Sequence, residues 1–431
     1  MEIVFTPVGI FSLAIIVFLF VLFSRNTAQA ALSLPCVTLL TSIIYYYVMP
    51  SLSFSNGRTG FLGVYIESMA SIHWGVLLYV LGASAAFLLT RSRYALDPAM
   101  PRTVDGPLIW GRFWLIAGVA LLGLLTLKSI GRLNLSLSDE FRMSDGVGNL
   151  AFLQLSISLL LPITIVYAVH DNFGLRAWAF ISASTFVFLV SGFRFRIAIL
   201  MIAIAASFSV TRGVRIRVIA VVLGTIFALI AFNAIGMARR YGAGLDLSVF
   251  KDLKWEEMLN SFGGEEGPIF AFLSVIEAPP PEWIAFDPWT IAIARLVPSF
   301  LWPDKPSPYY LYMYTSLFDE RVREYAGIAG PQQAEMMLQF GWFGIPLLSF
   351  LYFILIGFLV AKLMRLGREA RIAGMALVPG VFGFYMQQRG YFFQNISEAL
   401  FILGPLFLMH KKVKVPKHWS RTGGQRAVRV N

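Results

Sequence analysis

The chain consists mostly of apolar runs close to 20 residues long, separated by short polar segments. Such runs occupy residues 3–23, 30–49, 72–90, 113–129, 150–169, 217–237, 342–363, 372–387 and 391–409. A helix needs about 20 apolar residues to cross the hydrocarbon core of a bilayer, because it rises about 1.5 Å per residue. Each run therefore predicts one membrane-spanning helix.

A longer apolar stretch, residues 177–210, is interrupted by the sequence SGFRFR at 191–196. As one helix it would measure about 51 Å, against a hydrocarbon core of about 30 Å. We therefore expect the chain to turn back at the interruption and to form two short spans. These bring the total to about eleven, so the predicted fold class is an all-α polytopic membrane protein.

Composition agrees with this fold class. Hydrophobic residues make up 57% of the chain and charged residues only 14%, whereas soluble domains carry about 25% charged residues. The first run could also be a signal peptide, since Ala28-Gln29-Ala30 resembles a cleavage site. However, Glu2 precedes the run and Arg25 follows it, which is the reverse of the charge order of a signal peptide. We expect a spanning helix there.

Lysine and arginine set the predicted orientation, because cytoplasmic loops carry an excess of both. With the N-terminus outside, the inner loops and the C-terminal tail hold 20 of the 35 basic residues and only four of the 24 acidic ones. The tail alone carries seven basic residues and no acidic residue. The net charge of +11 is then mostly a topology signal, and we expect no nucleic-acid partner.

The same orientation divides the chain into four parts. They are about eight transmembrane helices in 1–237, a large outer loop in 238–333, about three transmembrane helices in 334–410 and a basic cytoplasmic tail in 411–431. The loop is rich in aromatic residues, which disordered segments lack. Within it we expect an amphipathic helix at 246–262 and an interfacial or re-entrant segment at 283–302. Loops of this length are usually functional or disordered.

Several common kinds of site are missing from the sequence. The single cysteine, Cys36, lies in an apolar run beside Pro35, which favours a packing role. The four histidines are scattered and never stand at ligand spacing with another donor. No glycine-rich phosphate loop or Ser-His-Asp arrangement is visible. We therefore predict no metal site and no cofactor.

Basic side chains on the predicted outer face are not explained by the topology rule. They are Arg194, Arg196, Arg239, Arg240, Arg295, Lys305 and Arg389. Guanidinium groups bind phosphate oxygens through paired hydrogen bonds, so the set predicts an anion site at the outer membrane surface. The alternative is that each side chain anchors the protein at lipid headgroups.

Carboxylates near these cations are candidates for a general base. Glu335 stands close to the start of a span, Glu398 lies inside the last span, and Glu265 and Glu266 lie on a glycine-flanked turn. A carboxylate at the membrane surface could deprotonate a sugar hydroxyl. It could also form a structural ion pair with an arginine, which is the commoner case, and the pair on the turn could simply be solvated.

Aromatic residues cluster in the second half of the loop. They are Trp283, Trp289, Trp302, Tyr309, Tyr310, Tyr312 and Tyr314. Such rings suit stacking on sugars, and an aromatic belt at a membrane interface has the same sequence pattern. Both interpretations remain open at this point.

Six segments carry a family resemblance. They are SGFRFRIAIL at 191–200, ARRYG at 238–242, GGEEGPIFAFL at 263–273, RLVPSFLWPDKP at 295–306, AEMMLQFGWFG at 334–344 and QRGYFF at 388–393. In their order along the chain they resemble the Wzy-type polymerases of bacterial O-antigen and exopolysaccharide repeat units. The resemblance covers roughly residues 180 to 400.

The resemblance implies a metal-independent glycosyltransferase with a GT-C-like architecture. Such an enzyme transfers a growing glycan from undecaprenyl diphosphate to an incoming lipid-linked repeat unit, on the periplasmic face of the bacterial inner membrane. It implies membrane lipid, a chain-length-determining protein and a flippase as further partners. Carried onto this chain, the expected diphosphate or glycan contacts are Arg194, Arg196, Arg240, Arg295, Lys305 and Arg389, and the expected base is Glu335 first and Glu266 second.

Two other functions remain as alternatives. O-antigen ligases are similar in plan and chemistry, but they rely on a histidine in the large outer loop, and residues 238–333 contain none. A transporter of lipid-linked oligosaccharides would show internal repeats and charges at the membrane midplane. We find no repeat, and only Glu398 is expected to lie deep.

Overall fold

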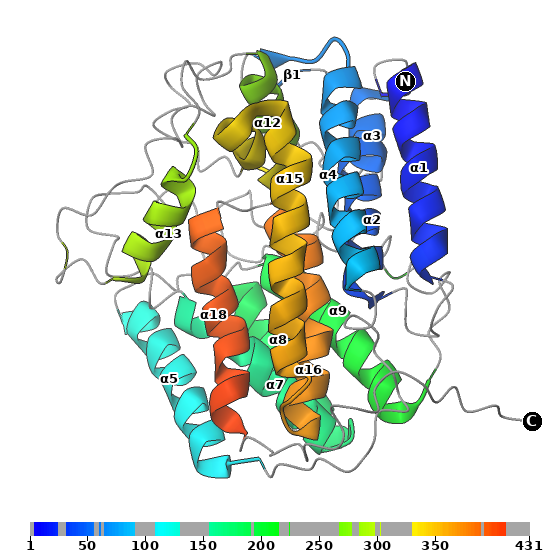
Figure 1. Ribbon diagram of the computed structural model, residues 1–431. Coiled ribbons are helices and arrows are strands. Elements are labelled where there is room, and N and C mark those ends of the chain that lie inside the picture. The colour runs from blue at the N-terminus through cyan, green and yellow to red at the C-terminus, as the bar shows by residue number, and fades with distance from the viewer. Residues whose placement is uncertain are drawn as a thin grey trace, which may run out of the picture.

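The computed structural model describes residues 4–24, 32–55, 60–61, 64–90, 108–129, 155–190, 194–214, 224, 267–277, 284–297, 302, 330–388 and 392–410. This part of the chain is mostly helical, and its helices form a bundle (Figure 1). Five of the described helices are long and apolar enough to cross a membrane. The protein is therefore an all-α membrane protein, as predicted.

The N-terminal part is a layer of helices on one side of the bundle. Its elements are α1 (Pro7–Ser24), α2 (Leu34–Ile43), the π-helix η2 (Ile44–Val48), α3 (Met49–Ser55), the two-residue strands β1 (Gly60–Phe61) and β2 (Val64–Tyr65), and α4 (Ala70–Leu89). The strands pair antiparallel, with Gly60 opposite Tyr65. They lie at the end of the bundle where α4 begins (Figure 1).

The middle part contributes α5 (Trp110–Ser129), α7 (Leu160–His170), α8 (Leu175–Val190) and α9 (Arg194–Arg212). The expected interruption within 177–210 is confirmed, because α8 ends at Val190 and α9 begins at Arg194. These two helices pack against each other and against α7. A single helix through this stretch is thus excluded.

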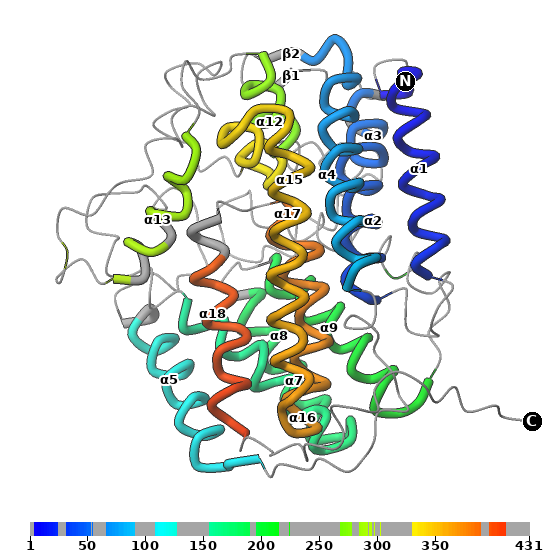
Figure 2. Tube along the Cα trace, in the orientation of Figure 1, coloured from blue at the N-terminus to red at the C-terminus, as the bar shows by residue number. Residues whose placement is uncertain are grey.

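The C-terminal part holds α12 (Gly267–Glu277), α13 (Asp287–Leu296), α15 (Gln332–Leu363), α16 (Arg368–Val378), the π-helix η8 (Pro379–Tyr385), α17 (Met386–Gln388) and α18 (Phe392–Met409). Helix α15 runs through the centre of the bundle, and α16 returns alongside it (Figure 2). Along its length α15 packs against α4.

Gly82 permits the close approach of α4 and α15. A Cβ atom at this position would collide with the Ser349 hydroxyl and the Pro346 carbonyl of α15. The two helices therefore meet at backbone distance, as small residues allow in membrane bundles.

Large apolar side chains are exposed on the outer helices. Phe18 of α1 is 65% exposed and Leu115 of α5 is 69% exposed. Long exposed apolar faces are unusual in soluble proteins and are the normal surface of a helix in lipid. The outer faces of α1 and α5 thus have the apolar character of a surface that faces lipid.

Every predicted apolar run coincides at least in part with a helix, except 217–237, of which all but residue 224 lies outside the described residues. The amphipathic helix expected at 246–262 lies outside them as well. Within 283–302, where an interfacial or re-entrant segment is expected, Asp287-Pro288 is the start of α13. Proline is favoured in a first helical turn, because the N–H it lacks would have no partner there.

Candidate functional site

Helix α15 is broken near its N-terminus. Phe340 (φ −145°, ψ 28°) and Gly341 (φ 63°, ψ −155°) have non-helical backbone angles inside the span Gln332–Leu363. The angles of Gly341 fall in a region that is almost restricted to glycine. Residues 332–339 consequently form a separate half-helix, set off from the long apolar helix that follows.

The half-helix is completely buried, although it carries four polar side chains. These are Gln332, Gln333, Glu335 and Gln339. Residues three, four and seven positions apart share one face of a helix, so Gln332, Glu335 and Gln339 point the same way. Glu335 itself is only 1% exposed. A buried carboxylate is costly in a membrane protein and marks a candidate functional site.

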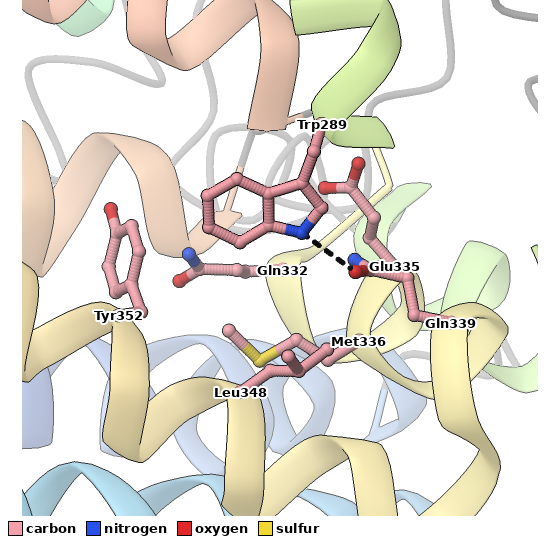
Figure 3. A pocket seen from close by; sticks show the side chains of 7 residues that line it. All are labelled: Trp289, Gln332, Glu335, Met336, Gln339, Leu348 and Tyr352. Atoms are coloured by element: carbon pink, nitrogen blue, oxygen red, sulfur yellow. Dashed lines mark hydrogen bonds between the residues drawn. The ribbon is translucent and has the colours of Figure 1, made fainter. Parts of the chain in front are cut away.

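A small cavity lies against this face. Its lining residues are Trp289, Gln332, Glu335, Met336, Gln339, Leu348 and Tyr352 (Figure 3). Its volume is about 20 Å³, which is room for about one water molecule or one hydroxyl group. Glutamate, glutamine, tryptophan and tyrosine side chains thus all contribute to the wall of a space of hydroxyl size.

Helix α13, from the large loop, is fastened to the half-helix at the break. The Trp289 Nε1–H donates to Gln339 Oε1 at 3.3 Å, and the Ile284 N–H donates to the Leu338 carbonyl at 3.0 Å. The rings of Phe286 and Phe340 meet edge to face, with centroids 5.5 Å apart. The loop segment thereby supplies one wall of the cavity (Figure 3).

Two buried tyrosines hold the half-helix from the N-terminal layer. The Tyr79 hydroxyl of α4 donates to Gln332 Oε1 at 2.8 Å, and the Tyr46 hydroxyl of η2 donates to Gln333 Oε1 at 3.1 Å. Hydrogen bonds between buried side chains fix both partners because leaving either group unsatisfied is costly. The amide of Gln332 is therefore held in one orientation.

Each of the two π-helices has a proline within it or just after it. In η2, Pro50 lacks the N–H that an α-helix would direct at the Tyr46 carbonyl, and this carbonyl accepts from His73 Nε2 at 3.0 Å. In η8, Pro379 is the first residue. Short π-helical segments occur often at functional sites, and η2 supplies Tyr46 to the half-helix network.

A second buried carboxylate, Glu398 of α18, has a different environment. Its Oε1 accepts from Arg196 Nε at 3.1 Å and from the Ser158 hydroxyl at 3.2 Å. Glu398 is 3% exposed and Arg196 6% exposed. This ion pair joins α18 to α9 across 202 positions of sequence. Glu398 therefore forms the structural ion pair with an arginine that was the alternative to a general base.

A third acidic residue, Glu369, forms contacts with two histidines at the opposite end of the bundle. Glu369, at the start of α16, lies 3.4 Å from His410 Nε2 and 3.8 Å from His170 Nδ1. The hydrogen bond from His410 lowers the pKa of the Glu369 carboxyl below its usual value. This cluster ties the ends of α7, α16 and α18 together and lies apart from the cavity.

Of the eight predicted site residues, Glu335 alone is placed at the cavity. Arg196 is placed in the ion pair with Glu398. Arg194 is the first residue of α9 and Arg295 the last but one of α13, and the side chains of both lie outside the description. Glu266, Arg240, Lys305 and Arg389 lie outside the described residues altogether. Among the described residues, no group of three or more His, Cys, Asp or Glu could hold a metal ion.

Sequence reasoning missed most of the cavity wall. Gln332, Gln339 and Tyr352 were not singled out, and Trp289 was named only within an aromatic set. One signal was available: the polar residues Gln332, Glu335 and Gln339 recur with helical spacing just before a long apolar run. Comparison of the chain with models of protein families, with curated proteins and with solved structures gave no match.

Proposed function

We propose that the protein is a polysaccharide polymerase of the bacterial inner membrane. It transfers a growing glycan from undecaprenyl diphosphate to the sugar end of an incoming lipid-linked repeat unit, without a metal ion. In this proposal the chain has about eleven spans, its N-terminus is outside, and its C-terminal tail is in the cytoplasm. The end of the bundle that holds α12, α13 and the half-helix then faces the periplasm.

The position of Glu335 is the observation that carries the proposal. Glu335 lines a cavity of hydroxyl size, beside a wall contributed by the large loop. A general base must lie within hydrogen-bond reach of the proton it removes. A sugar hydroxyl that enters this cavity meets that requirement, and the order of the sequence motifs points to the same kind of reaction.

The chemistry assigned to the site follows from these groups. Glu335 takes the proton of the acceptor hydroxyl while the hydroxyl oxygen attacks the anomeric carbon of the donor glycan. The bond from that carbon to the lipid diphosphate breaks, and the diphosphate leaves with the bonding electrons. Cationic side chains at the outer surface, with Arg194 and Arg295 as first candidates, stabilise the charge that develops on it.

The experiment uses the purified full-length protein and lipid-linked repeat units extracted from a strain that lacks the gene. We expect chains longer than one repeat unit, formed without added metal or nucleotide. Glu335→Gln should slow chain extension at least about 100-fold, since a general base contributes about 10²–10⁴-fold. The matched control is Glu277→Gln, because Glu277 ends α12 as an exposed carboxylate.

Two results would contradict the proposal. If folded wild-type protein left the repeat units unextended, the protein would not be a polymerase. If the Glu335→Gln variant kept full activity, Glu335 would not be the general base. In the deletion strain, single repeat units should remain attached to their acceptor, whereas loss of a ligase would leave none attached.

A further inference from the structure

The cavity beside Glu335 fits one hydroxyl group, and a water molecule has the same size. With about 20 Å³ of space it exceeds the roughly 10–15 Å³ that a single water needs. A buried water also needs two to four polar partners. Besides Trp289, the lining residues that carry polar groups are Glu335, Gln332, Gln339 and Tyr352 (Figure 3), and the Tyr352 hydroxyl donates to Met386 Sδ.

The orientation of one of these groups is fixed by chemistry. An indole N–H can only donate, so the Gln339 oxygen that faces Trp289 Nε1 is the acceptor in that bond. The Gln339 NH₂ group is then the part of the amide that can donate to an oxygen in the cavity. A carboxylate that accepts and an amide that donates suit either a water molecule or a sugar hydroxyl.

We propose that the same site hydrolyses the lipid-linked donor when no acceptor sugar occupies it. This inference rests on the proposed function, because it uses the same donor and the same base. The cavity has room only for the reacting hydroxyl and not for the rest of a sugar. The groups that activate this hydroxyl therefore meet the same O–H group whether it belongs to water or to a sugar. Discrimination must come from the rest of the acceptor, which brings binding energy that water lacks.

The step is balanced without a further reactant. Glu335 accepts one proton from water while the water oxygen bonds to the anomeric carbon. The bond between that carbon and the diphosphate oxygen breaks. The products are a free reducing glycan and undecaprenyl diphosphate, and the proton returns to solvent from Glu335.

The test uses the purified full-length protein and a lipid-linked repeat unit whose non-reducing terminal sugar is capped by O-methylation, so that it cannot act as acceptor. Mass spectrometry identifies the products. We expect a free glycan without phosphate, together with undecaprenyl diphosphate. Glu335→Gln should slow their release at least about 100-fold, as a general base contributes about 10²–10⁴-fold, and Glu277→Gln should leave the release unchanged.

The outcomes separate this inference from the polymerase proposal. Extension of uncapped units with no release from capped units overturns the inference and leaves the polymerase intact. Release from capped units without extension of uncapped ones supports the hydrolysis and overturns the polymerase. Release of a glycan phosphate with undecaprenyl phosphate means cleavage of the wrong bond and overturns the inference. Release that persists in a folded Glu335→Gln variant overturns it as well.

Discussion

Glu335 and Glu398 are both buried carboxylates in the C-terminal part of the chain, but their surroundings differ. Glu398 is bound by an arginine and a hydroxyl at 3.1 and 3.2 Å. Glu335 borders a cavity whose other lining side chains are all neutral. Burial alone thus does not distinguish a structural carboxylate from a catalytic candidate. The useful difference is that Glu335 lines a cavity.

The largest effect should come from breaking the ion pair. Glu398→Gln removes the carboxylate that neutralises buried Arg196, and loss of one partner of such a pair costs about 3–5 kcal/mol. We expect a loss of this size in the free energy of unfolding, measured by denaturant titration in mixed micelles. Removing both charges, in Arg196→Met combined with Glu398→Met, should recover most of it. An equally unstable double variant would mean that the pair itself does not account for the loss.

A shorter carboxylate at the cavity should affect activity instead of folding. Glu335→Asp keeps the charge but withdraws it by about one carbon–carbon bond, and a misplacement of about 1 Å can cost about 100-fold in rate. We expect chain extension to fall by about this factor at an unchanged unfolding midpoint. Glu277→Asp serves as the control. If the two variants extended chains equally fast, the position of the Glu335 carboxylate would be irrelevant.

Changing the helix break at Gly341 should have an intermediate effect, on both stability and chain extension. Gly341→Ala places a side chain at φ 63° and ψ −155°, where strain costs about 1–3 kcal/mol. The variant should lose about this much stability, and its chain extension should also fall because the half-helix that carries Glu335 must shift. Gly118→Ala is the control, since a Cβ there meets no atom within 4 Å. Loss of stability with full activity would show that the break does not position Glu335.

The smallest effect concerns the opposite end of the bundle. Glu369 has a pKa below its usual value of 4.5, chiefly because His410 donates a hydrogen bond to it. A lowered folded-state pKa means that the ionised group stabilises the fold above about pH 4.5, and that this contribution is lost as the pH falls through the folded-state pKa. The unfolding midpoint of wild type should therefore decline in this acidic range more steeply than that of Glu369→Gln. Parallel declines would argue against the contact.

The apolar runs predicted the helical class of the described part of the chain, but not α12 and α13, which lie in the expected loop, nor the contacts between helices. Apolar runs locate membrane helices because each must satisfy its own backbone in lipid, and the turn at 191–196 was predicted from the interruption of the apolar stretch together with its length. Gln332 and Gln333, the first two residues of α15, fell inside the expected loop 238–333, because they resemble a solvated segment until Tyr46 and Tyr79 are seen to bind the two amides. The Arg196–Glu398 pair joins residues 202 positions apart, a separation that no local pattern reports.

The π-helix η2 also makes the register of the N-terminal layer sensitive to chain length. An α-helix turns by about 100° per residue, so deleting one residue between Ile44 and Val48 would rotate one end of this span against the other by about that angle. Hydropathy would hardly change, and a helix of spanning length would remain. However, the contact of Tyr46 with Gln333 and the contact of Ser42 with Gln387 could no longer form at the same time. Gene variants that differ by one codon here would thus keep the membrane insertion signal and lose the internal alignment.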